Sequence, residues 1–323
     1  MGSNDENPRK SDSTQFKPIV EFHSAKATGI WLIIIAAVLW SSSGFFTQTK
    51  LLDVWPIEHR GTAIAVWRAL FSTLFLLPLV RKPSFNWVMI PMTLCFSGMT
   101  WTFLTALVSG SPANTIWLQY LAPAWVTLAS IFLFREIPRG RDWFMLGTCI
   151  LGVCFILVMD ALYSVPSKHY QWWAPLLAVM SGVCYAGVIM CMRVLRDHES
   201  SWLAALNHIV ILLVMSPMVW LSGVSLPTGW MWVILASLGI LQMGLPYYLF
   251  ARGLKSTPSH LASVITLLEP ILLPVWVHCM RSGDPEYQVP HWWTWVGAGL
   301  ILIGLTIRNV IRDEELQAEA SKA

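Results

Sequence analysis

This sequence predicts an all-α integral membrane fold, with ten transmembrane helices in two inverted five-helix repeats. Of the 323 residues, 55% are hydrophobic and only 12% are charged, too few charges for the surface of a soluble protein of this size. The apolar runs last about 20 residues without strict alternation, which is the length of a helix that crosses roughly 30 Å of hydrocarbon and argues against a β-barrel. One of these runs also recurs later in the chain.

Ten apolar runs follow one another along the chain. A polar stretch rich in Ser, Asn, Asp and Lys, residues 1–28, precedes them and predicts a disordered cytoplasmic tail. The first repeat is expected at 29–162, an external linker at 163–171, the second repeat at 172–310 and a short cytoplasmic tail at 311–323. The predicted spans are 29–49, 61–80, 87–108, 112–134, 142–162, 172–193, 202–222, 229–250, 258–280 and 292–310.

The repeat is clearest in two segments that begin at Ser111 (SPANTIWLQYLAP) and Thr257 (TPSHLASVITLLEP), each with proline as its second residue. Because five spans is an odd number, the second set must enter the bilayer with the opposite orientation, as in the inverted repeats of secondary transporters. Other residues match between the halves in the same order along the chain: Arg68 with Asn207, Trp40 with Tyr185, Trp101 with Tyr247, Gly98 with Gly244, Pro123 with Pro270, and Gly147 with Gly297.

Basic residues divide unequally between the two sides of the membrane. Only four lie in the loops of one side: Lys50, Arg60, Lys168 and Arg281. Sixteen lie on the other side: Arg9, Lys10, Lys17, Lys26, Arg81, Lys82, Arg135, Arg139, Arg141, Arg193, Arg196, Arg252, Lys255, Arg308, Arg312 and Lys322. The positive-inside rule therefore predicts that both termini are cytoplasmic, in a bacterial inner membrane. These flanks also explain the net charge of +3, so no nucleic-acid partner is expected.

The ordered set of motifs resembles the drug/metabolite transporter superfamily, and specifically its EamA-type ten-helix carriers, over residues 29 to 310. The motifs are WRALFSTLFLLPL with Arg68, LLEP with Glu269, and WVGAGLILIGL in the last span. The sequence departs from the family where a glycine–glutamate pair usually follows the fourth and ninth helices, and has Arg135-Glu136 and Arg281-Ser282-Gly283-Asp284 instead. The resemblance implies a basket of helices around a central cavity, the fifth and tenth helices outside it, and export of amino acids or other small metabolites.

Two charged residues lie deep in predicted spans, Arg68 in the second and Glu269 in the ninth. Because a charge in hydrocarbon costs at least about 2.5 kcal/mol, each needs a partner, water or a substrate. Their depths permit an ion pair that would only hold the two repeats together. Alternatively, Arg68 binds a substrate carboxylate, and Glu269 binds a substrate amine or a coupling proton.

Several further residues are candidates for the transport path, each with packing or interhelical hydrogen bonding as the alternative. Pro123 and Pro270 each remove a helical donor near mid-membrane and are candidate hinges. Other substrate-binding candidates are polar or aromatic side chains within the spans: Gln119, Asn207, Gln242, Trp40, Trp101, Tyr120, Tyr185, Tyr247 and Tyr248. Most other tryptophans lie near span ends, as in interfacial belts.

The sequence contains neither an HExxH motif nor a nucleophile motif, and its six cysteines lie inside apolar spans without a CxxC pair. We therefore expect that the protein is not an enzyme and that it contains no disulfide, metal or cofactor. The function predicted is secondary transport of a small molecule by alternating access, with export of amino acids or related compounds as the leading case. A lipid carrier or flippase, or a structural membrane protein, is the alternative. A monomer is sufficient, because the repeat is internal.

Overall fold

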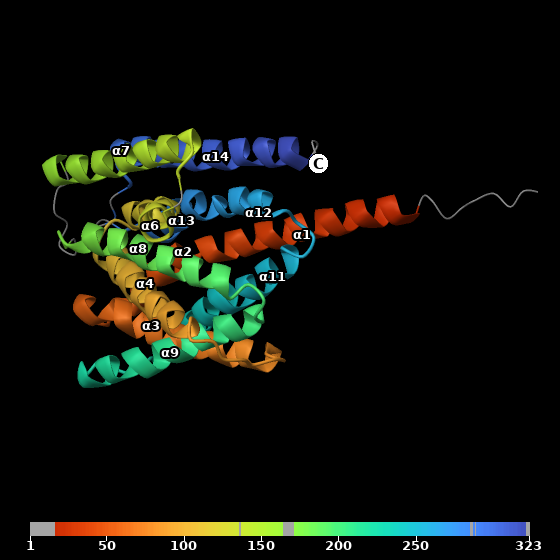
Figure 1. Cartoon of the computed structure of the whole chain (residues 1–323). Helices are drawn as coiled ribbons and strands as arrows, with labels where there is room; N and C mark the ends of the chain where they lie inside the picture. Colours follow the sequence, from red (N-terminus) through yellow and green to blue (C-terminus); the bar gives the residue numbers. More distant parts are fainter. Residues whose placement is uncertain (1–16, 136, 164–170, 285–286, 288, 321–323) are drawn as a thin grey trace, which may run out of the picture.

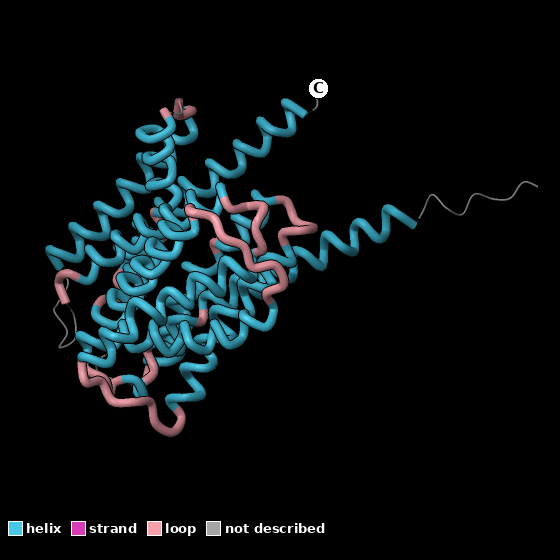
Figure 2. The backbone as a smooth tube through the Cα atoms, turned by 60° about the horizontal axis from the view of Figure 1, so that its bottom comes forward, coloured by secondary structure: helices cyan, strands magenta, loops and turns pink. Residues whose placement is uncertain are grey.

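The computed structural model describes residues 17–135, 137–163, 171–284, 287 and 289–320, and these are folded into helices joined by short loops, with no strand among them (Figure 2). Nine helical segments within this part are long and apolar enough to cross a membrane, and a tenth, Trp292–Arg308, is shorter and also apolar. The predicted fold class is confirmed.

The helices follow the predicted spans closely. The first repeat contains α1 (Lys17–Ser41), α2 (Ser43–Thr47), η1 (Lys50–Leu52), α3 (Ile57–Leu76), η2 (Leu77–Leu79), α4 (Met89–Ser109), α5 (Pro112–Gln119), α6 (Ala122–Phe134) and α7 (Gly140–Tyr163). The second contains α8 (Ala174–Val194), α9 (Ser200–Leu221), α10 (Met231–Ser237), η3 (Leu238–Gly244), α11 (Leu245–Gly253), α12 (Ser259–Thr266), α13 (Leu268–Arg281) and α14 (Trp292–Ala320).

The first helix begins earlier than predicted. It starts at Lys17, whereas the first span was expected from position 29, and most of the predicted tail, residues 1–16, lies outside the described residues. Pro18 is the second residue of the helix, where its missing N–H has no intrahelical acceptor to lose. No glycine follows until Gly29, so the helix continues without a break into the apolar span.

Pairing between helices shows the inverted repeat directly. The contact between α4 and α8 in the middle of the bundle is matched by the contact between α11 and α1, its equivalent under exchange of the repeats. The pairs α3–α9 and α7–α14 each join one helix to its own counterpart. A twofold relation between the halves produces this pattern, because exchanging them leaves every pairing unchanged.

Helices α7 and α14 lie side by side at one edge of the bundle, outside the basket formed by the others (Figure 1). Two glycines allow this close packing. A Cβ at Gly152 would lie 2.6 Å from the Gly297 carbonyl oxygen, and a Cβ at Gly297 would lie 2.4 Å from Ile156 Cγ1. The absence of side chains at both positions therefore sets the distance between these helices.

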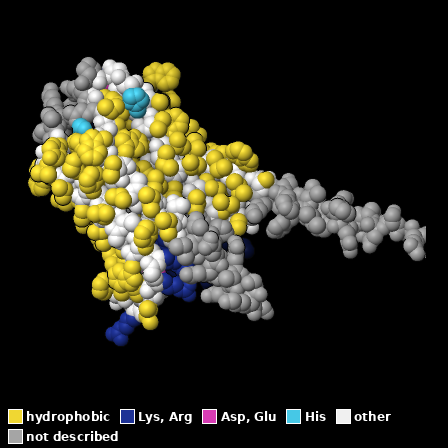
Figure 3. All heavy atoms as spheres, turned by 90° about the horizontal axis from the view of Figure 1, so that it is seen from above, with side chains coloured by type: hydrophobic (Ala, Val, Ile, Leu, Met, Phe, Trp, Pro, Cys, Tyr) yellow, Lys and Arg dark blue, Asp and Glu magenta, His cyan; other side chains and the backbone are white. Residues whose placement is uncertain are grey.

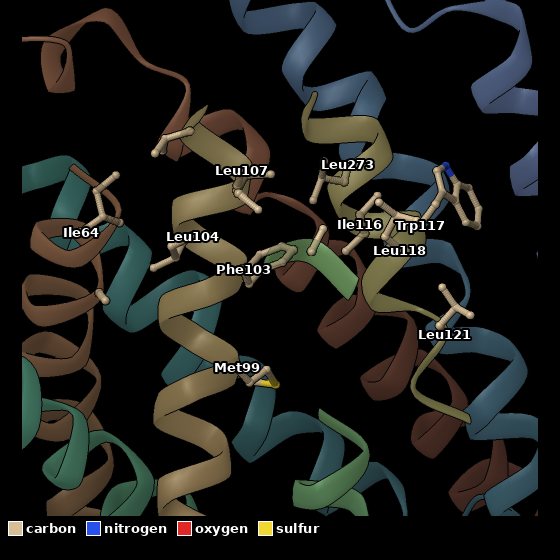
Figure 4. Packing of buried hydrophobic residues seen from close by; sticks show 14 of the residues in the cluster. Ile64, Met99, Phe103, Leu104, Leu107, Ile116, Trp117, Leu118, Leu121 and Leu273 are labelled. Atoms are coloured by element: carbon tan, nitrogen blue, oxygen red, sulfur yellow. The ribbon is translucent and has the colours of Figure 1, made fainter. Parts of the chain in front are cut away.

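Large hydrophobic side chains fill the interior and also cover the outside. Figure 4 shows the interior between α4 and α5, where Phe103, Leu107 and Ile116 belong to one buried cluster. The outward positions are equally apolar: Trp220 and Leu221, at the end of α9, are each 84% exposed. Hydrophobic side chains also dominate the face seen in Figure 3, on which α7 and α14 lie. An exterior of this kind is suited to lipid and not to water.

Candidate transport cavity

A cavity of about 860 Å³ lies between the two repeats, within the range of roughly 300–1,000 Å³ that small-molecule sites occupy. We call the membrane face on which the described chain begins and ends the terminal side, and the opposite face the hairpin side. Residues on the terminal side line the mouth of the cavity, among them Pro138, Arg193, Ser200 and Leu254. No described residue of the hairpin-side loops lines it, so the cavity opens towards the terminal side.

Arg68 is the buried cation of this cavity. It comes from the middle of α3 and is 3% exposed. Its guanidinium donates a hydrogen bond of 3.3 Å to Gln242 Oε1, and Gln242 Nε2 donates one of 3.1 Å to the Trp40 carbonyl oxygen. Gln242 lies in the π-helical segment η3, a distortion often found at functional sites. Gln242 from the second repeat, itself held by the Trp40 carbonyl of α1, thus fixes where Arg68 points.

Glu269 is the carboxylate that α13 contributes to the cavity. It is the second residue of α13 and lies half-buried in the cavity wall. The Tyr120 hydroxyl, from the other repeat, lies 2.8 Å from Glu269 Oε2 and 3.0 Å from the Thr266 carbonyl oxygen, and its one proton can serve either acceptor. Tyr120 therefore orients Glu269 without neutralising its charge.

The ion pair that the sequence permits between Arg68 and Glu269 is not formed. Among the described residues Arg68 has no ion pair, and its hydrogen-bond partner is the neutral Gln242. Both charged groups instead line the same cavity. Because a buried charge without a counterion is costly, the arrangement favours a ligand that supplies the missing charges, or water that solvates both groups.

Aromatic rings cover the cavity wall near these charged groups. The rings of Trp40 and Tyr247 meet edge to face with centroids 5.4 Å apart, and Trp40 also lies 5.2 Å from Phe250. Tyr185 adds another ring to the lining. Such rings offer both apolar area and a negative face for cationic groups.

The structure brings most of the predicted site residues together. Ten line the cavity: Trp40, Arg68, Gln119, Tyr120, Pro123, Tyr185, Asn207, Gln242, Tyr247 and Glu269. Asn207 is 4% exposed, and its Oδ1 has no hydrogen-bond partner, whereas Gln119 Nε2 donates to Ser181 Oγ at 2.7 Å. Gln119 is thus tied to α8, whereas the amide oxygen of Asn207 is buried without a partner.

Three predicted residues do not line the cavity. Trp101 donates its indole N–H to Thr62 Oγ1 at 3.0 Å, so it ties α4 to α3. The Tyr248 hydroxyl accepts a hydrogen bond of 3.3 Å from Arg252, one helical turn further along. Pro270 is buried within α13, next to Glu269. Adjacent residues on a helix point about 100° apart, so only part of a clustered motif can face one cavity.

Some residues of the cavity were not predicted. Thr100, Thr127 and Ser130 line its wall. At the mouth, Arg308 Nε donates to Asp142 Oδ1 at 2.8 Å, joining α14 to α7. Hydroxyl residues are common in transmembrane packing, so their presence in the spans does not indicate a cavity. Asp142 and Arg308 could have been found from the sequence, because they are opposite charges at matching ends of the fifth and tenth spans.

The fourth and ninth membrane segments are both interrupted beside the cavity. The first breaks between α5 and α6 at Tyr120 and Leu121, and the second between α12 and α13 at Leu267. Pro123 and Pro270 lie at the second and third positions of the helices that follow. A proline in the first turn of a helix loses no intrahelical bond, so both fit a new helix start.

The profile of the EamA-like transporter family matches this chain twice, at residues 27–158 and at residues 172–310. The chain belongs to the EamA-like transporter family. The two matched regions correspond to the two halves of the bundle.

Similar proteins agree with that membership. The uncharacterized transporter YwfM of Bacillus subtilis (strain 168) is 20% identical over 300 residues, covering 90% of this chain and 96% of YwfM. The uncharacterized transporter YxxF of the same organism is 22% identical over 309 residues, covering 91% and 94%. One solved crystal structure is 17% identical and covers 89% of this chain and 99% of its own, with a TM-score of 0.56; it shows the shared fold alone. The EamA family member described here is therefore an integral membrane transporter.

Proposed function

We propose that this protein is an inner-membrane secondary transporter that exports amino acids or related small metabolites by alternating access. The observation that carries the proposal is a pair of opposite charges, Arg68 and Glu269, that line one cavity without pairing with each other. A zwitterion has a carboxylate for Arg68 and an ammonium group for Glu269. A zwitterion would therefore satisfy both residues at once, whereas a molecule without charged groups would leave both unpaired.

The polar neighbours support the same assignment. On the carboxylate-binding side, Gln242 fixes the Arg68 fork, and Asn207 contributes an amide at the position equivalent to Arg68 in the other repeat. On the amine-binding side, Tyr120 and Tyr185 place rings beside Glu269. An acidic group among aromatic rings is a good environment for an ammonium ion. A proton is an alternative occupant of Glu269, which would couple transport to the proton gradient.

The orientation is compatible with export. The terminal side contains most of the basic residues, so the positive-inside rule makes it the cytoplasmic side. The cavity opens to this side, and a substrate would enter it from the cytoplasm. The breaks next to Pro123 and Pro270 are suited to act as hinges for closing it and opening the other side.

Counterflow in proteoliposomes tests the proposal, using a panel of labelled amino acids, amines and carboxylates. Exchange of an amino acid that Glu269→Gln abolishes and Glu58→Gln leaves intact would support it, because Glu58 is exposed in the first turn of α3 and lies outside the cavity. If no panel member is exchanged while labelled phospholipid crosses the bilayer faster than in protein-free liposomes, the protein is a lipid carrier and the proposal fails.

A further inference from the structure

The hairpin side carries a network of five charged side chains that lies outside the cavity. Arg281 donates to Asp284 Oδ2 at 2.7 Å and to Asp53 Oδ1 at 3.2 Å. Arg60 contacts the same Asp53 oxygen at 2.7 Å, and Lys50 lies 3.6 Å from Asp284. Two aspartates thus connect three basic residues in one chain of contacts. We call these five residues the hairpin network.

The network joins the two repeats. Asp53 and Arg60 belong to the loop before α3 and to its first turn, in the first repeat. Arg281 is the last residue of α13, in the second repeat. A second contact reinforces the junction: Trp55, 1% exposed, donates its indole N–H to the Ser225 carbonyl oxygen at 2.9 Å, in the loop after α9. The repeats are therefore fastened together at the membrane face opposite the open cavity.

The sequence makes this network unusual. The sequence predicts only four basic residues on this side, and three of them, Lys50, Arg60 and Arg281, are in the network. Basic residues are selected against on the translocated side, so their retention beside two aspartates points to a specific role.

The network is partly shielded from solvent, although Asp53, the residue that links the repeats, is 39% exposed. The side chains of Arg60 and Asp284 are each 11% exposed and that of Arg281 is 16% exposed. Arg60 is fixed further by hydrogen bonds from its guanidinium to the carbonyl oxygens of Asp53 and Trp55. Isolated exposed ion pairs contribute little, but shielded networks with several hydrogen bonds contribute more. Lys50, 66% exposed, is the weak outer member.

We propose that the hairpin network is a latch that keeps the hairpin side closed while the cavity is open to the terminal side. Opening of the hairpin side requires the repeats to separate there, which breaks the contact between Arg281 and Asp53 and the weaker contact between Lys50 and Asp284. The contacts between Arg281 and Asp284 lie within one repeat and can persist. The latch goes beyond the proposed function and rests on its alternating access, although it does not depend on which substrate is carried.

The test measures which side of the membrane has access to the cavity. Thr266 lies half-buried in the cavity wall, and Thr266→Cys introduces a probe of similar size. A charged, membrane-impermeant thiol reagent is applied to intact cells and to inside-out membrane vesicles, so that both faces are probed. The chain without this substitution corrects for its native cysteines, of which Cys154 and Cys279 are exposed.

Asp53→Asn keeps the shape of the side chain but removes the charge that links the repeats. In this variant we expect labelling from the hairpin side to rise about threefold to fivefold, which is the change in population that one ion pair of ordinary strength produces. Labelling from the terminal side should fall. Arg281→Gln breaks the same contact from the other repeat and should give the same shift. The double variant should add nothing, because the two residues share one interaction.

One graded variant and one control isolate the latch. Lys50→Gln removes the exposed 3.6 Å contact to Asp284, which also joins the repeats, and should raise labelling from the hairpin side by less than Asp53→Asn does. Asp197→Asn removes the charge of an exposed pair, Arg196–Asp197, outside the network and should leave both rates within error of the unsubstituted protein. Unchanged labelling in both Asp53→Asn and Arg281→Gln would overturn the latch, even if transport continues. If the labelling shifts but no amino acid is exchanged, the latch stands and the proposed substrate class fails.

Discussion

Replacement of Arg68 by alanine tests whether this residue recognises a carboxylate or only connects helices. In the structure its guanidinium makes one hydrogen bond, to the neutral Gln242, and no ion pair among the described residues. Arginine has five N–H donors, so several remain for a ligand in the cavity. We expect Arg68→Ala to weaken carboxylate-containing substrates selectively and to leave uncharged analogues nearly unaffected.

The size of the effect follows from the kind of hydrogen bond that is lost. A hydrogen bond to a charged partner contributes about 1.5–3 kcal/mol. Because about 1.4 kcal/mol corresponds to a factor of ten in affinity, the half-saturating concentration of an amino acid should rise about 10- to 150-fold. Arg68→Lys keeps the charge but lacks the planar fork, so a smaller loss is expected.

Counterflow in proteoliposomes measures this selectivity directly when an amino acid is compared with its carboxamide. The two substrates differ only in the group that Arg68 is proposed to bind. Arg196→Ala is the matched control, because the Arg196 side chain is 81% exposed and lies outside the cavity. An equal loss for the acid and the amide in Arg68→Ala and Arg68→Lys would refute the reasoning and assign Arg68 to helix packing.

Three further predictions concern packing, a buried carboxylate and the helix breaks. Gly297→Val should lower the free energy of unfolding by about 1–3 kcal/mol through overpacking, whereas Gly147→Ala, in open space on the same helix pair, should not lower it; thermal unfolding in detergent compares them. Asp160→Ala should lower the free energy of unfolding by at least about 1–3 kcal/mol, because the buried N–H groups of Asn114 in α5 and Trp293 in α14 lose their acceptor. An unchanged melting temperature would contradict this. Pro123→Ala and Pro270→Ala should each lower the maximal transport rate without changing the half-saturating concentration, and unaltered kinetics would remove these prolines from the hinges.

Composition and the repeat were enough to predict the fold. Ten apolar runs of membrane length fixed the spans, since a helix must satisfy its own backbone in lipid. The recurrence of the Ser111 segment at Thr257 fixed the inverted arrangement, and the helix pairs α4–α8 and α11–α1 now show it in space. The start of the first helix at Lys17 was missed, because the polar composition of the first residues outweighed the helix-start signal of Pro18.

The candidate site was predicted in part. The sequence singled out Arg68 and Glu269, because charges in apolar spans are rare and costly, but it left open whether they pair with each other. Depth along a helix is a one-dimensional quantity, whereas pairing depends on how helices rotate and cross. Trp101 and Tyr248 show the same limit, since both lie at plausible depths but face neighbouring side chains.

The sequence by itself therefore determined the membrane class, the number of spans, the internal symmetry and the residues whose charge demands a function. Tertiary structure decided that Arg68 and Glu269 line one cavity without an ion pair, that the cavity opens on the terminal side, and that Asp53 and Arg281 meet across the opposite face. The physical reason is that hydrophobicity and charge are local properties of a segment. Contacts between side chains more than two hundred positions apart arise only when the helices have packed.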